Sequence, residues 1–157
     1  MEIKVGLKAP NFSLFDSDKN KITLSDFEGK SNVLILFFPQ AFTGVCTQEL
    51  CSVRDNITQY NNVNAQVLGI SVDSVFTLAK FKEEQKLNFP LLSDFNKEVS
   101  TAYNSLYETF VFDMKGVSKR SAFLIDKQGI IQYAEILEDV KQIPNFNAIN
   151  DALKGLE

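Results

Sequence analysis

One segment sets the architecture of this chain, and it reads Val33-Leu34-Ile35-Leu36-Phe37-Phe38-Pro39-Gln40-Ala41-Phe42-Thr43-Gly44-Val45-Cys46. Residues 33–38 form an unbroken apolar run of the kind that a central strand needs when both of its faces are covered. Pro39 ends this run, and Thr43 is suited to cap the start of a helix. The segment therefore predicts a buried strand, a short loop and then a helix with Cys46 in its first turn.

The residues after Thr43 repeat their apolar positions with helical spacing. Steps of three and four connect Cys46, Leu50, Val53, Ile57 and Tyr60. With Thr43 as the N-cap, Cys46 is the third helical residue, where free N–H groups and the helix dipole favour a negatively charged sulfur. Cys51 lies about 140° further around this helix, beside polar positions, and is a poor core position.

Strand and helix patterns alternate outward from this segment. The expected strands cover residues 67–72, 91–92, 122–125 and 130–134, and the last two form a hairpin around a glycine turn. The expected helices cover residues 75–86, 99–103 and 146–153, and Phe81 faces inward. Residues 11–14 and 21–24 predict an N-terminal hairpin. The aromatic-rich loop carrying Tyr107, Phe110 and Phe112 receives no element, and the whole chain, 1–157, reads as one α/β domain.

Composition excludes several classes of function. The chain has no histidine, so chemistry built on a histidine base is excluded, and two cysteines are too few for a finger-type zinc site. We therefore expect no metal and no cofactor. Sixteen basic and 20 acidic side chains give a formal charge of -4 that is spread along the chain, which argues against nucleic acid as a partner.

Apolar patterning sets an expectation for location. The longest strongly apolar run has six residues, whereas a helix that crosses a bilayer needs about 20. The first ten residues contain charged side chains and no apolar core of a secretory signal. We therefore expect a cytoplasmic protein that does not bind membranes and whose thiols are reduced.

The residues alone leave the role of each candidate side chain open. Cys46 could fill the core, although its place in the first helical turn favours a reactive sulfur. Cys51 could be a spectator thiol, and Arg120 could be a surface charge in a run with Lys115 and Lys119. In an intact helix the two cysteines are separated by roughly 7.5 Å along the axis, and a disulfide needs Cα atoms within about 7 Å. Pairing would therefore require the first turn or two to unwind.

The run Pro39-x-x-x-Thr43-x-x-Cys46 resembles the active-site signature of peroxiredoxins. The pair Phe37-Phe38 precedes it, and matching places after it hold Glu49, Arg54 and Asp55. A second block is similar to the family's late strand, which opens with an arginine: Arg120-Ser121-Ala122-Phe123-Leu124-Ile125-Asp126. The similarity covers nearly the whole chain, from Gly6-x-x-Ala9-Pro10-x-Phe12 to the last helix.

Two branches of the family share features with this chain. The run Phe37-Phe38-Pro39-x-Ala41-Phe42-Thr43-Gly44-x-Cys46 resembles the one-cysteine branch named for alkyl hydroperoxide reductase E. The spacing Cys46-x-x-x-x-Cys51 instead resembles the bacterioferritin comigratory protein branch, also called peroxiredoxin Q. The resemblance implies a thioredoxin-like fold, in which a central mixed sheet is flanked by helices.

The resemblance also implies a role for each site residue. Cys46 would be the peroxidatic cysteine, which becomes a sulfenic acid as the peroxide O–O bond breaks. Thr43 would hold the peroxide, Pro39 would shield the pocket, and Arg120 would stabilise the thiolate and the leaving oxygen. Glu49, which is otherwise typical of a solvated helix position, would at most support these groups indirectly.

We therefore predict a thiol peroxidase for hydrogen peroxide and organic hydroperoxides, with Cys51 as the resolving cysteine and a thioredoxin-like protein as the reductant. One alternative is a one-cysteine peroxidase with Cys51 as a spectator. Another is a thioredoxin-like disulfide oxidoreductase, although such proteins usually separate their cysteines by two residues rather than four. A third is a redox-sensing binding module that uses the loop 103–112 as its contact surface. We expect a monomer or a weak homodimer.

Overall fold

Strand β3 (Asn32–Phe37) is the middle strand of a five-stranded sheet in the computed structural model, which describes residues 2–156. The order across the sheet is β5-β4-β3-β8-β9, formed with β4 (Ala65–Ser71), β5 (Leu91–Ser93), β8 (Ser121–Ile125) and β9 (Ile131–Ile136). β3, β4 and β5 are parallel, whereas β8 and β9 are antiparallel to their neighbours. The predicted mixed sheet is therefore confirmed. The ends of the expected domain, Met1 and Glu157, lie outside the described residues.

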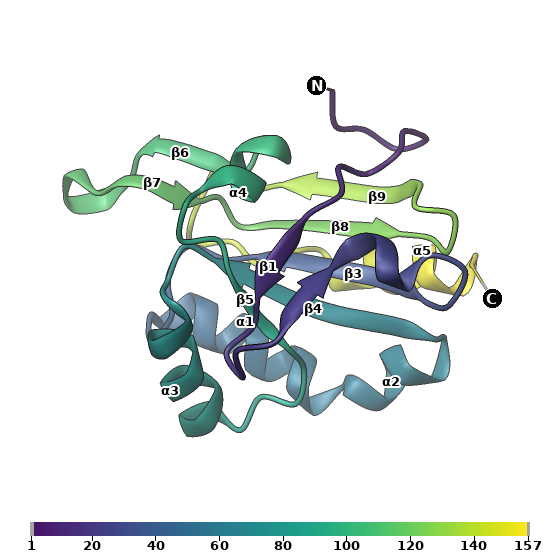
Figure 1. The fold of residues 1–157 in the computed structure, drawn as a ribbon, viewed down its shortest axis with the longest axis horizontal. Helices are drawn as coiled ribbons and strands as arrows, with labels where there is room; N and C mark the ends of the chain where they lie inside the picture. Colours follow the sequence, from purple (N-terminus) through teal and green to yellow (C-terminus); the bar gives the residue numbers. More distant parts are fainter. Residues whose placement is uncertain (1, 157) are drawn as a thin grey trace.

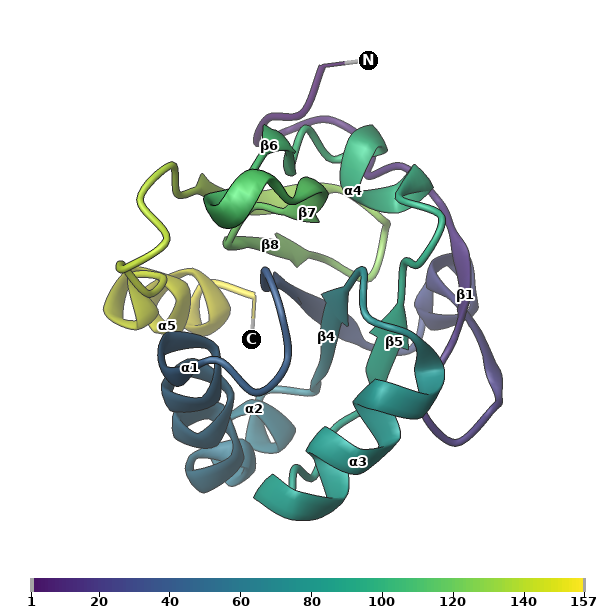
Figure 2. The same ribbon diagram turned by 90° about the vertical axis from the view of Figure 1, so that its left-hand side faces the viewer.

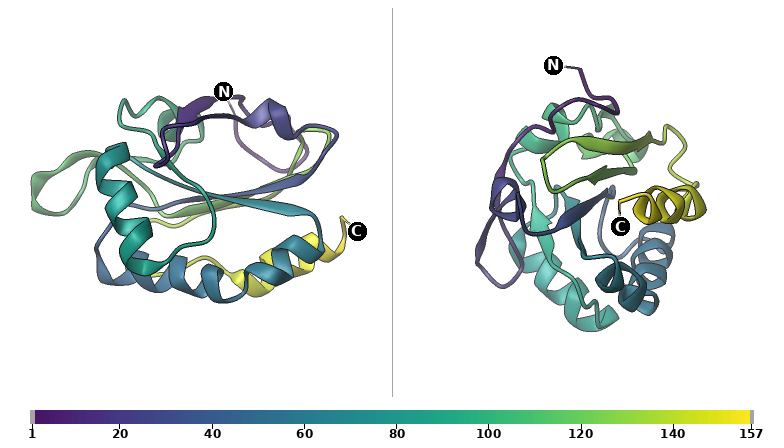
Figure 3. Two further views of the ribbon diagram at one scale, coloured as in Figure 1. Left: turned by 60° about the horizontal axis from the view of Figure 1, so that its bottom comes forward. Right: turned by 90° about the vertical axis from the view of Figure 1, so that its right-hand side faces the viewer.

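Alternate residues of β3 point into two separate cores. Leu34 and Leu36 pack with α1 (Gly44–Asp55), α2 (Ile57–Asn62), α3 (Val75–Gln85) and α5 (Phe146–Lys154). Val33, Ile35 and Phe37 pack on the other face, which is covered by the N-terminal segment and by α4 (Glu98–Ala102). Figures 1 and 3 show these two layers on opposite sides of the sheet. Because both faces of β3 are covered, its residues must be apolar without a break.

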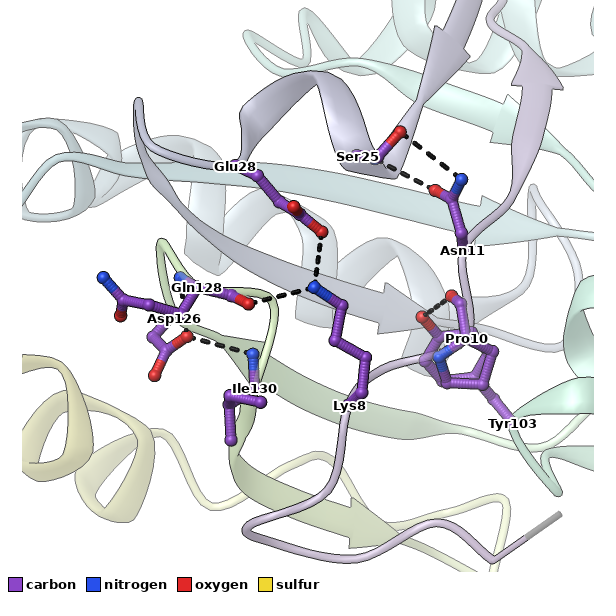
Figure 4. Close-up of polar contacts among 9 residues, drawn as sticks. All are labelled: Lys8, Pro10, Asn11, Ser25, Glu28, Tyr103, Asp126, Gln128 and Ile130. Carbon is purple, nitrogen blue, oxygen red and sulfur yellow. Dashed lines mark hydrogen bonds and ion pairs between the residues drawn. The ribbon is translucent and has the colours of Figure 1, made fainter.

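The N-terminal segment is fastened to its face of the sheet by polar contacts (Figure 4). The Lys8 ammonium donates to Glu28 Oε1 at 2.8 Å and to the carbonyl of Gln128 at 3.1 Å. The Tyr103 hydroxyl donates to the carbonyl of Pro10 at 2.6 Å. The segment then enters the predicted hairpin, which consists of β1 (Ser13–Phe15) and β2 (Lys21–Thr23) and is followed by the short 3₁₀ helix η1 (Leu24–Phe27).

The aromatic-rich loop, to which the sequence assigns no element, forms a second hairpin. Its strands are β6 (Leu106–Thr109) and β7 (Lys115–Ser118), and the 3₁₀ turn η2 (Val111–Asp113) joins them. Figure 1 shows this hairpin extending beyond the end of the sheet. A buried Ser100 Oγ–Ser118 Oγ hydrogen bond of 2.7 Å connects its base to α4. The strands have only four residues each, and no strict alternation of apolar and polar residues indicated them.

The apolar stripe that begins at Cys46 differs from its prediction. It runs across two helices rather than one, because α1 ends before Asn56 and α2 follows immediately. The Asn56 side chain donates to the carbonyl of Ser52 at 2.8 Å, which helps to satisfy the end of α1. Cys46 and Tyr60 are nevertheless both buried on the same side of the sheet, as their spacing indicated. Within the described residues, every helix is too short or too polar to cross a bilayer.

Candidate active site

Figure 2 looks onto the edge of the sheet where β3 and β4 end and α1 begins. Thr43 has extended backbone angles and is the N-cap of α1, so Cys46 is the third helical residue, as predicted. The Thr43 hydroxyl donates to the carbonyl of Gln40 at 2.9 Å rather than capping the helix. Thr47 Oγ1 donates to the carbonyl of Thr43 at 2.8 Å. Because the Thr43 hydroxyl is the donor in its contact with Gln40, its oxygen can still accept a hydrogen bond.

The loop before α1 is held in a strained shape. Phe42 has a φ of +67°, which is uncommon for any residue except glycine. Its side chain is 49% exposed, and its ring lies 5.1 Å from that of Phe81, measured between centroids. Asp73 Oδ2 accepts the backbone N–H of Ala41 at 2.8 Å and the Ser71 hydroxyl at 2.7 Å. Asp73 therefore ties the loop to the end of the neighbouring strand β4.

Arg120 lies at the centre of the site. Its side chain is fully buried, so the alternative of a surface charge is wrong for this residue. One terminal nitrogen donates to Glu49 Oε1 at 2.6 Å. The other terminal nitrogen donates to Cys46 Sγ at 3.2 Å and to the carbonyl of Val140 at 3.2 Å. Cys46 and Glu49 reach the same guanidinium because residues three apart lie on one side of a helix.

The backbone around Arg120 explains how a charged side chain is held inside the protein. The N–H of Lys119 donates to the carbonyl of Ser105 at 2.7 Å. The Ser121 hydroxyl donates to Ser105 Oγ at 2.9 Å. Arg120 therefore sits between two anchored residues at the start of β8, and its direction is fixed before the side chain makes its own contacts.

Burial dominates the electrostatics of the Arg120–Glu49 pair. It raises the pKa of Glu49 to about 7, although the guanidinium of Arg120 opposes this rise. Burial also lowers the pKa of Arg120, but the charges of Glu49 and Cys46 offset that effect, and the pKa is raised. Among the described residues, Glu49 Oε2 and Arg120 Nε have no protein hydrogen-bond partner. The interpretation of Glu49 as a solvated position is therefore wrong, since this side chain is fully buried.

Cys46 combines two features that the sequence presented as alternatives. Its side chain is fully buried and belongs to the core, yet its sulfur accepts a hydrogen bond from a cation. Hydrogen bonds from a cation favour the charged form of the atom that accepts them. Cys46 is therefore both a core residue and the acceptor of a charge-assisted hydrogen bond.

A cleft of about 330 Å³ opens beside Arg120. Pro39, Thr43 and Arg120 line one part of it, as the sequence resemblance implied for a substrate pocket. The rest is mostly apolar and includes Phe110, Val111, Phe112 and Met114 from the β6–β7 hairpin. The contribution of the hairpin was not predicted, because residues 106–118 carried no recognisable motif.

Cys51 lies in a different environment further along α1. It is half-buried, its thiol donates to Gln85 Oε1 at 3.5 Å, and both cysteines are free. Arg54 Nη1 donates to the carbonyl of Gln85 at 2.5 Å. The helix between Cys46 and Cys51 is intact, so the two sulfurs are separated as the sequence predicted for this state. Within the described residues there is no cluster of histidine, cysteine and carboxylate side chains that could hold a metal.

Comparisons with known proteins agree with these motifs. A model of the AhpC/TSA family matches residues 5–134. The chloroplastic 2-cysteine peroxiredoxin of Chattonella marina var. antiqua is 40% identical over 167 residues, covering 100% of this chain and 80% of that protein. Alkyl hydroperoxide reductase E of Mycobacterium tuberculosis is 38% identical over 156 residues, covering 98% of each. The structure of peroxiredoxin Q of Xanthomonas campestris matches with a TM-score of 0.83 at 26% identity, covering 96% of this chain and 97% of that one.

Proposed function

This chain belongs to the AhpC/TSA family of peroxiredoxins, and from this membership we propose that it reduces hydroperoxides at the sulfur of Cys46. Thiol-dependent peroxidase activity is supported by its peroxiredoxin relatives and by the fold that it shares with them. One observation supports Cys46 most directly, namely the 3.2 Å contact between its sulfur and the buried guanidinium of Arg120 beside a cleft.

The first chemical step is attack by the Cys46 thiolate on one oxygen of the hydroperoxide. An S–O bond forms as the O–O bond breaks, and the oxygen that bonds to sulfur keeps its proton, which gives the sulfenic acid. The other oxygen leaves as an alkoxide, or as hydroxide when the substrate is hydrogen peroxide, and takes up a proton from solvent to become an alcohol or water. Arg120 stabilises the thiolate before this step and the charge on the departing oxygen during it.

The other residues of the pocket orient the peroxide. The Thr43 hydroxyl donates to the protein, which leaves its oxygen free to accept the O–H of a hydroperoxide. Pro39 is buried and lines the cleft, where it limits the access of water. Glu49 holds Arg120 in position without touching the substrate. The apolar walls of the cleft leave room for the organic part of an alkyl hydroperoxide.

The second step is attack by Cys51 on the Cys46 sulfenic acid. The S–S bond forms as the S–O bond breaks, and hydroxide leaves and takes up a proton to become water. The start of α1 must unwind for this step. Three features make that start weak: Gly44 is the first helical residue, no side chain caps the helix, and no acidic residue lies in its first turn. A thioredoxin-like protein would then reduce the disulfide.

Two substitutions test these assignments. Cys46→Ser should abolish peroxide consumption, and retained activity would refute the whole proposal. Cys51→Ser should leave the single-turnover loss of peroxide unchanged but stop multiple turnover with thioredoxin. If turnover continues unchanged and mass spectrometry finds no internal disulfide in the oxidised wild type, Cys51 is a spectator.

The other two functions considered from the sequence are not favoured by the comparisons. A disulfide oxidoreductase would reduce insulin rapidly, whereas we expect this protein to be nearly inert in that assay. A binding module would use the loop 103–112, of which Tyr103 is fully buried and contributes nothing to a surface. Loss of peroxide consumption in Cys46→Ser distinguishes the enzyme from both alternatives.

The remaining expectations concern the state of the protein in solution. We propose that residues 1–157 fold as one domain, for which a single unfolding transition seen by two spectroscopic probes is the test. We propose a monomer or a weak homodimer, and sedimentation over a range of protein concentrations distinguishes the two. A cytoplasmic location stays a prediction, and fractionation of the source cells tests it.

A further inference from the structure

The thiol of Cys51 contacts a residue of the neighbouring helix, and a cation contacts the same residue. Its sulfur lies 3.5 Å from Gln85 Oε1, at the last residue of α3. Arg54 follows Cys51 by three residues on α1 and therefore lies on the same side of that helix. Its Nη1 atom donates to the backbone carbonyl of the same Gln85 at 2.5 Å. The sulfur and the guanidinium therefore converge on one residue of the neighbouring helix.

Further contacts hold this end of α1 in place. Asn88, which follows α3 in the chain, donates from Nδ2 to the backbone carbonyl of Arg54 at 3.2 Å. Asn88 and Gln85 therefore both contact the turn of α1 that contains Arg54. Arg54 Nε donates to Asp55 Oδ1 at 2.9 Å, which leaves the terminal nitrogens for the side where Gln85 lies. These contacts do not involve Cys46 or the first turn of α1. The half of the helix that carries Cys51 can therefore stay docked on α3 while the first turn unwinds.

We propose that Arg54 prepares Cys51 for its attack on the Cys46 sulfenic acid, by stabilising the Cys51 thiolate while Gln85 holds that sulfur in place. This inference rests on the proposed function, because it has meaning only if Cys51 resolves the sulfenic acid. Arg54 is thus a positioning and charge-stabilising residue of the second step and has no part in the first.

The chemistry of the three side chains supports this role. Only the thiolate attacks a sulfenic sulfur efficiently, and a nearby guanidinium is a common means of stabilising one. The pKa of Arg54 is raised, chiefly by its hydrogen bond to Asp55 and also by the charge of Cys51. The Gln85 carboxamide accepts from the thiol now, and after rotation it can donate an N–H to the thiolate. The step needs no oxidant other than the sulfenic acid itself.

The first experiment measures the alkylation rate of Cys51 by iodoacetamide, in the Cys46→Ser background at pH 7.5. Arg54→Met should slow alkylation about fivefold, which corresponds to the upper range for a partly exposed ion pair. Arg54→Lys should restore most of the rate because it keeps the charge. Lys80→Met, which removes the same charge from an exposed position of α3, should change nothing.

A second variant keeps the test valid if Arg54→Met disturbs the helix. Gln85→Glu keeps the size of the side chain but places an anion beside the sulfur, so it should also slow alkylation. Equal alkylation rates in wild type, Arg54→Met and Gln85→Glu would overturn the proposal.

The second experiment separates this proposal from the proposed function. Wild type and Arg54→Met react with one equivalent of hydrogen peroxide, and rapid quenching with mass spectrometry follows the sulfenic acid and the disulfide. We expect equal rates of sulfenic acid formation and slower disulfide formation in Arg54→Met. Equal disulfide rates would refute only the role of Arg54. No sulfenic acid in wild type would refute the peroxidase assignment, and sulfenic acid without any disulfide would refute resolution by Cys51 and this inference with it.

Discussion

The two ends of α1 contain the same chemical pair in different surroundings. Near its start, Cys46 meets the guanidinium of Arg120, and both side chains are fully buried. Near its end, Cys51 and Arg54 each contact Gln85, and Arg54 is about 29% exposed, so water competes for both groups. A charge pair interacts more strongly where water is excluded, because the effective dielectric constant is lower. The comparison teaches that direct contact and burial, rather than the choice of residues, separate a strongly held sulfur from one that stays free to react next.

The largest expected effect comes from removing the buried cation. Arg120→Met should slow sulfenic acid formation on Cys46 by about 10²–10³-fold, the usual cost of losing one preorganised donor. Arg54→Met should leave this step unchanged, because its guanidinium does not contact Cys46. Stopped-flow measurement of the first turnover checks both variants. Equal slowing of sulfenic acid formation in the two variants would contradict the distinction between the two ends of α1.

Removing the carboxylate beside each arginine should lower the free energy of unfolding by different amounts at the two ends of α1. Glu49→Ala leaves Arg120 buried without its ion partner, and we expect a loss of about 3–5 kcal/mol in the free energy of unfolding. Asp55→Ala breaks the exposed pair with Arg54, and we expect less than about 1 kcal/mol. Urea unfolding at pH 8 measures both values. Similar losses in the two variants would contradict the assignment of a strong and a weak end.

The pH dependence of stability offers a finer test of the buried end. The pKa of Glu49 is raised from 4.5 to about 7 by burial, so the folded protein holds this proton more tightly than the unfolded chain does. The part of the Glu49 contribution that depends on its proton is therefore complete below about pH 4.5 and is lost as the pH rises through about 7, above which the ion pair with Arg120 remains. The difference between wild type and Glu49→Gln, measured by urea unfolding from pH 4.5 to 8, should show this fall. A difference that stays constant with pH would contradict it.

The smallest effect should come from the loop that precedes Cys46. Asp73→Ala removes the acceptor of the Ala41 N–H, and we expect a loss of about 1–2 kcal/mol in stability. We also expect peroxide consumption to slow about tenfold, because the loop that carries Thr43 is less well positioned. Disulfide formation after the sulfenic acid is made should keep its rate, since Asp73 does not contact the end of α1 that holds Cys51. Slowing of both steps would mean that the two ends are coupled.

Much of this arrangement could be predicted because it depends on local patterns. The apolar run at 33–38 requires a strand covered on both faces, and β3 lies in that position. The spacing from Thr43 to Cys46 places the sulfur in the first turn of a helix, and α1 begins there. The motif around Arg120 identified a residue that lies 74 positions from Cys46 in the chain.

Other parts could not be predicted, because they depend on contacts between distant residues. Arg120 follows Lys119 in a charged run, and nothing local distinguishes the fully buried residue from its half-buried neighbour. The contact between Cys51 and Gln85 joins two helices, and their packing sets it. Asp73 is the exception, since a carboxylate just after a parallel strand lies at the edge where such sites form.

The left-handed backbone of Phe42 has a consequence for any attempt to improve this protein. Glycine at that position would remove a conformational penalty of about 1–2 kcal/mol. The same change would let the loop sample several conformations and would remove the ring that contacts Phe81. The released strain and the lost ring contact oppose each other, so a screen for heat resistance alone is not expected to replace this phenylalanine.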